Sequence, residues 1–156
     1  MSKKINIYKS KKEKLNIESP KKVSVIIPNY NYANYIIERI DSCLMQTYPI
    51  YEIIILDDCS TDNSVQIINK KIEEIKKEQP NLKIQFVVNE KNSGGCVFKQ
   101  WKKGFEIATG DYIWIAEADD SAESDFVENL IKAFDDPEVV LSFCESARID
   151  GENNLI

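Results

Sequence analysis

The sequence predicts an α/β domain built on a mostly parallel sheet with helices on both faces. Short apolar runs rich in β-branched residues alternate along the chain with segments whose apolar residues recur at helical spacing. The chain has 156 residues, of which 43% are hydrophobic and 29% charged. That length and composition are typical of one globular domain with a sizeable buried core.

The first half of the chain holds two pairs of a strand and a helix. The run 23–27 predicts a buried strand, and helical spacing over 35–44 predicts the helix that follows it. The continuous apolar run 53–56 predicts a second buried strand, because strands covered on both faces lose the alternation of polar and apolar residues. A stripe of apolar residues over 65–75 predicts a second helix, which ends before Pro80.

The second half repeats this order. Residues 82–88 predict a third strand, and apolar spacing over 97–108 predicts a third helix. Residues 111–115 predict a fourth, buried strand, residues 124–134 a fourth helix, and residues 139–143 a fifth strand. The sheet edge near 139–143 is incomplete, which predicts self-association or modest stability.

An acidic cluster follows the apolar run 111–115. Glu117, Asp119 and Asp120 place three carboxylates within four positions. Crowded carboxylates repel one another, so such an arrangement is usually stabilised by a cation or by pKa shifts. If the alternation of the strand continues, Glu117 and Asp119 point the same way and share one hard metal ion. The alternative is a solvated acidic loop that caps the next helix.

Three polar loops are expected to meet at one edge of this sheet. Ligands bind outside the carboxyl ends of the strands in open α/β sheets, and the loops 28–31, 57–62 and 117–120 each follow a strand. A nucleoside diphosphate at this edge requires a divalent ion, Mg²⁺ or Mn²⁺, to screen its phosphates from the acids. Asp58 is the candidate to accept a hydrogen bond from a base N–H, and Tyr30 the candidate to stack on the base. Helix-cap and turn chemistry is the alternative for the aspartates of 57–62, and a partly buried aromatic at a strand end is the alternative for Tyr30.

Residue usage excludes several classes of protein. The chain has no histidine, and its four cysteines are far apart, which excludes zinc sites and His-based triads and argues against a disulfide framework. No apolar run approaches the length of a membrane span, and the polar start at Met1 does not resemble a signal peptide. A cytoplasmic location is therefore expected.

The net charge of −6 conceals an asymmetry. Residues 1–22 hold eight lysines against Glu13 and Glu18, so the rest of the chain is strongly acidic and nucleic acid is not an expected partner. The basic segment 1–22 is interpreted as a flexible, solubilising arm. The alternative is contact with anionic lipid, which would place the protein peripherally at the inner face of the membrane.

Four stretches, in their order and spacing, resemble the family 2 glycosyltransferases of the GT-A fold. They are Ser24-Val25-Ile26-Ile27-Pro28-Asn29-Tyr30-Asn31, Gln46-Thr47-Tyr48-Pro49, Glu52-Ile53-Ile54-Ile55-Leu56-Asp57-Asp58-Cys59-Ser60-Thr61-Asp62, and Gly110-Asp111-Tyr112-Ile113 leading to Glu117-Ala118-Asp119-Asp120. The resemblance covers residues 23–156 and implies the Rossmann-like nucleotide-binding half of a GT-A domain. It also implies metal-dependent transfer of a sugar, with inversion, from a nucleotide diphosphate donor to the hydroxyl of a carbohydrate or lipid-linked acceptor, with a UDP-sugar favoured and surface polysaccharide as the commonest destination.

The same resemblance implies roles for individual residues. Pro28, Asn29 and Tyr30 lie where the family contacts the nucleoside, and Asp58 where it binds the base. Glu117 and Asp119 occupy the family's Asp-x-Asp position. Asp119 is then the direct ligand of Mn²⁺ or Mg²⁺, Glu117 lies nearer the ribose, and Asp120 follows as in many members.

The chain departs from the family's pattern in three ways. Glu117 stands where aspartate is usual, and Trp101-Lys102 stands where an Arg-Asn pair is common. Lys99 and Lys102 are the candidates to substitute in diphosphate contacts, although a solvated helix face is the favoured interpretation of both. No candidate for the general base that deprotonates the acceptor is found up to Ile156, so the base is expected in a C-terminal acceptor-binding half or in another chain.

Other functions remain open at this point. A non-catalytic, metal-dependent nucleotide-binding module is the main alternative, because the expected base is missing. A phosphoacceptor receiver domain requires a phosphorylatable Asp after a middle strand, whereas 82–88 is followed by Asn89-Glu90. A nucleotidyltransferase requires a Gly-rich basic loop after the first strand, and 28–31 is not such a loop.

Overall fold

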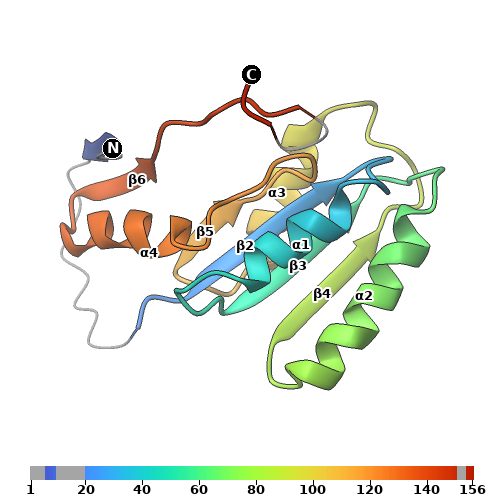
Figure 1. The fold of residues 1–156 in the computed structure, drawn as a ribbon, viewed down its shortest axis with the longest axis horizontal. Helices are drawn as coiled ribbons and strands as arrows, with labels where there is room; N and C mark the ends of the chain where they lie inside the picture. Colours follow the sequence, from blue (N-terminus) through green and yellow to red (C-terminus); the bar gives the residue numbers. More distant parts are fainter. Residues whose placement is uncertain (1–5, 10–19, 151–153) are drawn as a thin grey trace.

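The computed structural model describes residues 6–9, 20–150 and 154–156. Most of the expected basic arm, residues 1–5 and 10–19, lies outside the described residues. In chain order the elements are β1 (Asn6–Lys9), β2 (Val23–Asn29), α1 (Ile36–Leu44), β3 (Glu52–Asp57), α2 (Ser64–Glu78), β4 (Lys83–Val88), α3 (Val97–Ile107), β5 (Tyr112–Ile115), α4 (Phe126–Ile131), the 3-10 helix η1 (Lys132–Asp135) and β6 (Val139–Phe143) (Figure 1).

The main sheet has four strands in the order β4-β3-β2-β5, and all of its neighbouring pairs are parallel. Every residue of β2 and β3 is buried, because these two continuous apolar runs occupy the centre of the sheet. The expectation that 111–115 forms a buried strand is corrected in part. β5 pairs with β2 on one side only, so its residues are half-buried or exposed.

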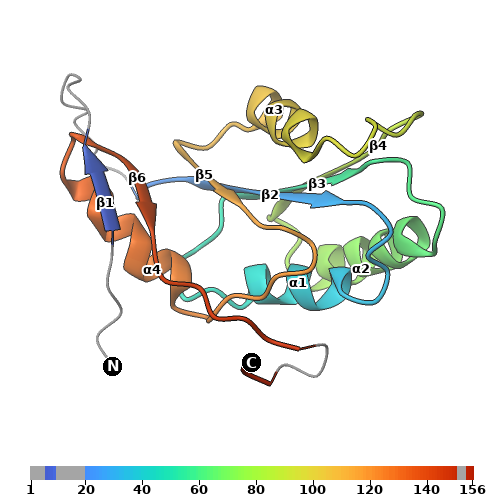
Figure 2. The ribbon, with the colours of Figure 1, turned by 90° about the horizontal axis from the view of Figure 1, so that it is seen from above.

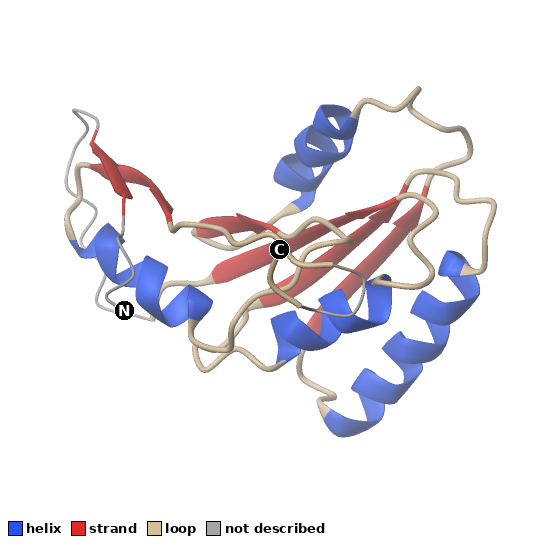
Figure 3. Cartoon of the chain, turned by 45° about the horizontal axis from the view of Figure 1, so that its top comes forward, coloured by secondary structure: helices blue, strands red, loops and turns tan. Residues whose placement is uncertain are grey.

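Helices cover both faces of this sheet, as the sequence predicts. Figure 2 shows α1 and α2 on one face and α3 on the other, and Figure 3 shows the same layers from a third direction. Ile26 and Ile54 of the central strands pack on the α3 side, whereas Val25 and Ile53 pack against α1 and α2. The approach of α3 is close, since a Cβ added at Gly104 would lie 2.6 Å from Cγ2 of Ile26.

The position of the fifth predicted strand is a correction. Residues 139–143 do form a strand, β6, but it pairs antiparallel with β1 in a separate two-stranded sheet (Figure 2). The partner strand, Asn6–Lys9, belongs to the segment expected to be a flexible arm. An apolar run indicates that a strand forms, but the path of the preceding chain decides which strand it meets.

Hydrogen bonds made by Gln46 and Thr47 connect the end of α1 to α4. Gln46 Oε1 accepts a hydrogen bond from the Val127 backbone N–H at 2.9 Å, at the start of α4. Thr47 Oγ1 donates to Glu128 Oε2 at 2.7 Å. The helix expected over 124–134 is observed as α4 continued by η1, because a 3-10 turn tightens its end before Asp136-Pro137.

All four cysteines are free, as expected from their spacing. Within the described ranges, the helices are either too short or too polar to cross a bilayer.

Candidate functional site

The three predicted loops meet at the carboxyl edge of the parallel sheet. Asn31 of the first loop accepts hydrogen bonds on Oδ1 from the Thr61 backbone N–H at 2.7 Å, and its own N–H donates to Ser60 Oγ at 2.9 Å. Tyr32 connects the first loop with the acidic one. The pKa of its phenol is raised by burial first, and then by the charge of Asp119 and a hydrogen bond to it. The three loops therefore lie at one edge of the sheet, as the positions of their strands predict.

Asn29 and Asp57 hold the ends of β2 and β3 together. Asn29 Nδ2 donates to Asp57 Oδ2 at 2.7 Å, and Ser60 Oγ donates to the same oxygen at 2.6 Å. Both Asn29 and Asp57 are buried, so their side chains hold the two strand ends together inside the protein and do not face a ligand. Turn and cap chemistry therefore accounts for Asp57 and Ser60, and the side chain of Asn29 does not project from the edge. Pro28 is likewise buried within β2, and Tyr30 is 43% exposed.

Two residues in these loops adopt left-handed backbone conformations that the sequence analysis did not anticipate. Asn31 has φ of 59° and Cys59 has φ of 63°. Asparagine tolerates this region because its short side chain bonds locally, and here Asn31 bonds to Thr61. For Cys59 the conformation is more costly, and it turns the chain immediately after Asp58.

Asp58 is almost fully buried, and its carboxylate is already engaged by the protein. Oδ1 accepts from Asn89 Nδ2 at 2.8 Å and from Gln100 Nε2 at 2.8 Å. The backbone N–H of Ser93 lies 3.0 Å from both oxygens, and Ser93 Oγ donates to Oδ2 at 2.6 Å. A carboxylate offers about four acceptor positions, so these donors leave little capacity unused. Asp58 thus anchors the loop 89–96 in this structure.

The acidic segment is a turn and not a continuation of the strand. β5 ends at Ile115, and the Asp120 backbone N–H donates to the Glu117 carbonyl oxygen at 3.1 Å. Strand alternation therefore does not extend to Glu117 and Asp119, and the expectation that it points them the same way is corrected. Glu117 is half-buried, whereas Asp119 and Asp120 are exposed.

Glu117 is held by Trp101, a contact that the sequence analysis missed. Trp101 Nε1 donates to Glu117 Oε1 at 2.7 Å. Burial raises the pKa of the Glu117 carboxyl, the Trp101 hydrogen bond opposes that rise, and the charges of Asp119 and Asp120 add to it. Two of the three departures from the family's pattern, at Trp101 and Glu117, are thus in direct contact.

Successive residues of α3 contact two of the predicted groups. Gln100 is buried and donates to Asp58, and Trp101 donates to Glu117. The first half of α3 therefore links the candidate base-binding residue to the acidic turn. The signal available in the sequence was the helical spacing over 97–108, which predicts the helix but does not show which side chains meet.

Arg39 is a second residue that the sequence analysis did not select. Its side chain is only 3% exposed, and its guanidinium carbon lies 4.9 Å from the centre of the Trp114 ring. Burial lowers the pKa of this guanidinium, and the negative charges of Asp120, Glu117 and Asp119 oppose the shift. A buried positive charge therefore accompanies the acidic turn.

The two lysines considered for diphosphate contacts have other partners. Lys102 is exposed and forms an ion pair with Glu106 one turn later on α3. Lys99 Nζ donates to the Ser93 carbonyl oxygen at 2.8 Å. The arrangement of Lys102 agrees with a solvated helix face, and Lys99 supports the loop that is anchored on Asp58.

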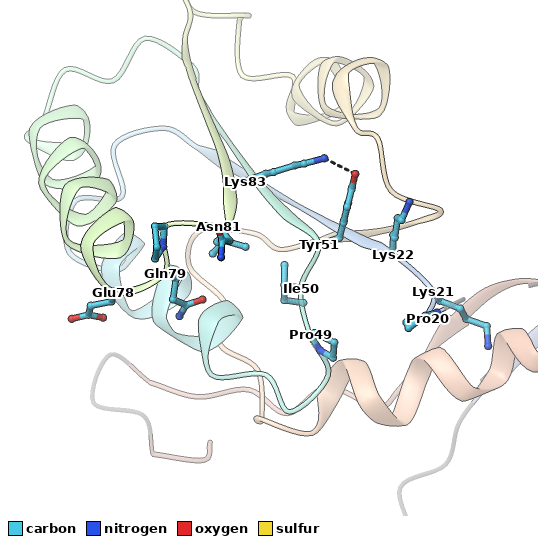
Figure 4. A pocket seen from close by; sticks show the side chains of 12 residues that line it. Pro20, Lys21, Lys22, Pro49, Ile50, Tyr51, Glu78, Gln79, Asn81 and Lys83 are labelled. Atoms are coloured by element: carbon cyan, nitrogen blue, oxygen red, sulfur yellow. Dashed lines mark hydrogen bonds between the residues drawn. The ribbon is translucent and has the colours of Figure 1, made fainter. Parts of the chain in front are cut away.

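Two hollows border the sheet. An open one of about 1930 Å³ extends from Arg39 and Asp120 along the free edge of β5 to β6. A smaller one of about 570 Å³ lies at the opposite, amino-terminal edge, where Lys83 and Lys22 flank the Tyr51 ring (Figure 4). Only the larger hollow is lined by part of the predicted site.

No preformed metal cage is present in the described part of the chain, where no three acidic or thiol side chains converge on one point. Mg²⁺ is nevertheless usually bound through one or two carboxylates together with water and substrate phosphates. Two exposed carboxylates beside a half-buried one fit that kind of site, in which a ligand completes the coordination shell.

Comparison with known proteins identifies the family. The model of glycosyl transferase family 2 matches residues 24–156, and the chain belongs to this family. It is 36% identical over 121 residues to the putative teichuronic acid biosynthesis glycosyltransferase TuaG of Bacillus subtilis, which covers 78% of this chain and 45% of that protein.

Solved structures agree with the fold. The chain matches TarS of S. aureus in complex with UDP-GlcNAc with a TM-score of 0.62 and 31% identity, over 74% of this chain and 31% of that one. It matches a mannosyltransferase of Pyrobaculum calidifontis in complex with GDP-Man and Mn²⁺ with a TM-score of 0.66 and 27% identity, over 77% of this chain and 34% of that one. The predicted α/β fold of the GT-A type, with a mostly parallel sheet and helices on both faces, is confirmed. The chain spans less than half the length of each of these three proteins.

Proposed function

We propose that this chain forms the donor-binding part of a glycosyltransferase that uses a nucleotide diphosphate sugar, with a UDP-sugar favoured. The observation that carries the proposal is the meeting of three loops at one sheet edge, where an acidic turn lies beside the loops after β2 and β3. Family membership and the nucleotide sugars bound by similar structures support it. The acceptor is a hydroxyl on a carbohydrate or lipid-linked molecule, and the transfer inverts the anomeric carbon.

The acidic turn is the proposed metal site. Asp119 would bind Mn²⁺ or Mg²⁺ directly, with Asp120 beside it and Glu117 nearer the ribose. Asp119 and Asp120 are exposed, so their carboxylates are available to a ligand without rearrangement of the core. When bound, the ion screens the diphosphate from these acids and stabilises negative charge on the departing nucleotide.

The nucleoside is proposed to lie over the loops after β2 and β3. Tyr30 is exposed enough to stack on a base, and the backbone at Pro28 and Asn29 lines the same edge. Asp58 would accept a hydrogen bond from the base, as uracil N–H would require. Because Ser93 now occupies Asp58 Oδ2, base binding on this proposal requires the Ser93 hydroxyl to share or leave that oxygen.

The general base is proposed to lie outside residues 1–156, in an acceptor-binding half or in another chain. On this proposal, the 156 residues bind the nucleotide but transfer sugar poorly by themselves. Robust transfer to a defined acceptor by this polypeptide alone would contradict that part of the proposal. Self-association of the chain is a separate proposal, which rests on the open strand edge.

Calorimetric titration tests the donor site. The chain is titrated with UDP, GDP and dTDP, first with Mn²⁺ and then with excess chelator. We expect metal-dependent binding that is strongest for UDP, and a ligand at about a hundred times its Kd should add roughly 2.7 kcal/mol to the free energy of unfolding.

Two variants make the titration specific. Asp119→Ala should abolish metal-dependent binding. Asp111→Ala removes an exposed carboxylate at the other end of β5 and should leave binding unchanged. The absence of binding to all three nucleotides by the folded wild-type chain would refute the proposed donor site.

A further inference from the structure

Trp101 and Glu117 form a hydrogen bond between two different elements at the acidic turn. Trp101 lies on α3, Glu117 follows β5, and their Nε1 and Oε1 atoms are 2.7 Å apart. Both side chains are half-buried. The indole N–H has one direction and no acceptor capacity, so this bond defines the position of one carboxylate oxygen.

The group that donates the hydrogen bond to Glu117 is an uncharged indole N–H, and this affects the charge of the acidic turn. An arginine or lysine at this position would pair with Glu117 and cancel its charge. The indole N–H instead holds the carboxylate and leaves its negative charge in place. The indole occupies one acceptor position on Oε1, so Oε2 is the more open oxygen for a ligand at the acidic turn.

The Trp101 ring is itself held in place. Phe98, one turn earlier on α3, packs edge-on against it with ring centroids 4.9 Å apart and planes at 81°. Gln100, the preceding residue, is buried against Asp58. The indole therefore approaches Glu117 from a fixed position on the helix, which is what a positioning contact requires.

We propose that Trp101 is a positioning residue for Glu117, whose indole N–H orients the carboxylate so that Oε2 faces the metal–diphosphate or ribose of the donor. This inference rests on the proposed donor site at the acidic turn. Trp101 and Glu117 act as one unit, in which the ring of Trp101 supplies packing and its N–H supplies the functional contact.

A double-mutant cycle tests this coupling. Trp101→Phe keeps an aromatic ring and removes the N–H, Glu117→Ala removes the acceptor, and the double variant removes both. In titrations with UDP and Mn²⁺ we expect Trp101→Phe to weaken binding about tenfold, which corresponds to about 1.4 kcal/mol. The double variant should bind no more weakly than Glu117→Ala, because Trp101 acts only through Glu117.

Two further variants distinguish loss of the Trp101–Glu117 hydrogen bond from a general loss of packing on α3. Phe105→Leu changes an exposed aromatic residue on the same helix and should leave the affinity unchanged. Glu117→Asp keeps the charge but withdraws the carboxylate by one methylene from the indole. It should weaken binding by a similar factor, and it should make affinity insensitive to Trp101→Phe. Thermal melting confirms that each variant is folded.

A spectroscopic readout is independent of the calorimetry. The chain has two tryptophans, so in a Trp114→Phe background the emission comes from Trp101 alone. Addition of UDP with Mn²⁺ should quench that emission, since a paramagnetic ion at the acidic turn lies close to the indole. UDP with Mg²⁺ should quench it much less.

The outcomes separate this inference from the proposed function. Normal UDP affinity in Trp101→Phe, or a double variant about tenfold weaker than Glu117→Ala, would overturn the positioning role and leave the donor site standing. No nucleotide binding by the folded wild-type chain would overturn both.

Discussion

The guanidinium of Arg39 lies over the ring of Trp114, 4.9 Å from its centroid. Both residues line the larger hollow together with Asp120 of the acidic turn. Arg39 is buried, and within the described residues its Nε has no hydrogen-bond partner. A buried cation of this kind offsets the mutual repulsion of the nearby acids when no metal is bound.

Replacement of Arg39 tests whether its positive charge offsets the repulsion among the acids of the turn. Arg39→Met should lower the free energy of unfolding by about 2 kcal/mol in chelator, because a desolvated cation–π contact and a counter-charge are lost. UDP with Mn²⁺ should raise the melting temperature of the variant by more than that of the wild type, because the ion then takes over the role of the lost charge. Equal ligand-induced shifts in the two proteins would contradict the counter-charge role.

The close contact between Gly104 and Ile26 predicts intolerance of a side chain at 104. Gly104→Ala would place its Cβ 2.6 Å from Cγ2 and 2.7 Å from Cδ1 of Ile26. We expect a loss of about 1–3 kcal/mol in unfolding free energy, measured by urea denaturation. Ile26→Val removes Cδ1 and should recover part of that loss in the double variant. A stabilised Gly104→Ala chain would show that α3 can move away from the sheet.

The Asp58 carboxylate accepts hydrogen bonds from three side chains and one backbone group, so its amide analogue should fit poorly. Asp58→Asn turns one acceptor into a donor that faces other donors, and we expect a loss of about 2–3 kcal/mol in unfolding free energy. UDP affinity should fall in the same variant. Asp111→Asn, at an exposed carboxylate, serves as the control and should change stability by less than about 1 kcal/mol.

Glu52 should make stability depend on pH. Burial acts to raise the pKa of this carboxyl, but hydrogen bonds from Ser24 and Thr109 outweigh it and hold the pKa below its ordinary value. The charged form is therefore favoured by folding, and the stability it contributes is present above the unfolded pKa and lost as pH falls through the folded pKa.

The measurement is urea denaturation of wild type and Glu52→Gln at pH 7 and at pH 3. The variant should be less stable by about 1–2 kcal/mol at pH 7, and the difference should narrow in acid. A difference that is constant across this range would show that the charge of Glu52 does not contribute.

The prediction of the fold succeeded where the signal was local. Runs such as Ile53-Ile54-Ile55-Leu56 report burial on both faces of a strand, and the helical stripes report one buried face. Both are properties of a few consecutive residues. Strand 139–143 was expected from the same signal, but its antiparallel partner at 6–9 was not, because pairing depends on where distant segments lie.

The candidate site divides in the same way. The order of residues along the chain shows which residue types stand after each strand, and therefore that acids, a tyrosine and Asp58 gather at one edge of a parallel sheet. The contacts of each of these side chains depend on how the helices pack on that sheet. Trp101 meets Glu117 and Gln100 meets Asp58 because α3 packs on the sheet through Gly104 and Ile26, and no periodicity in the chain encodes which side chains such packing brings within hydrogen-bond distance.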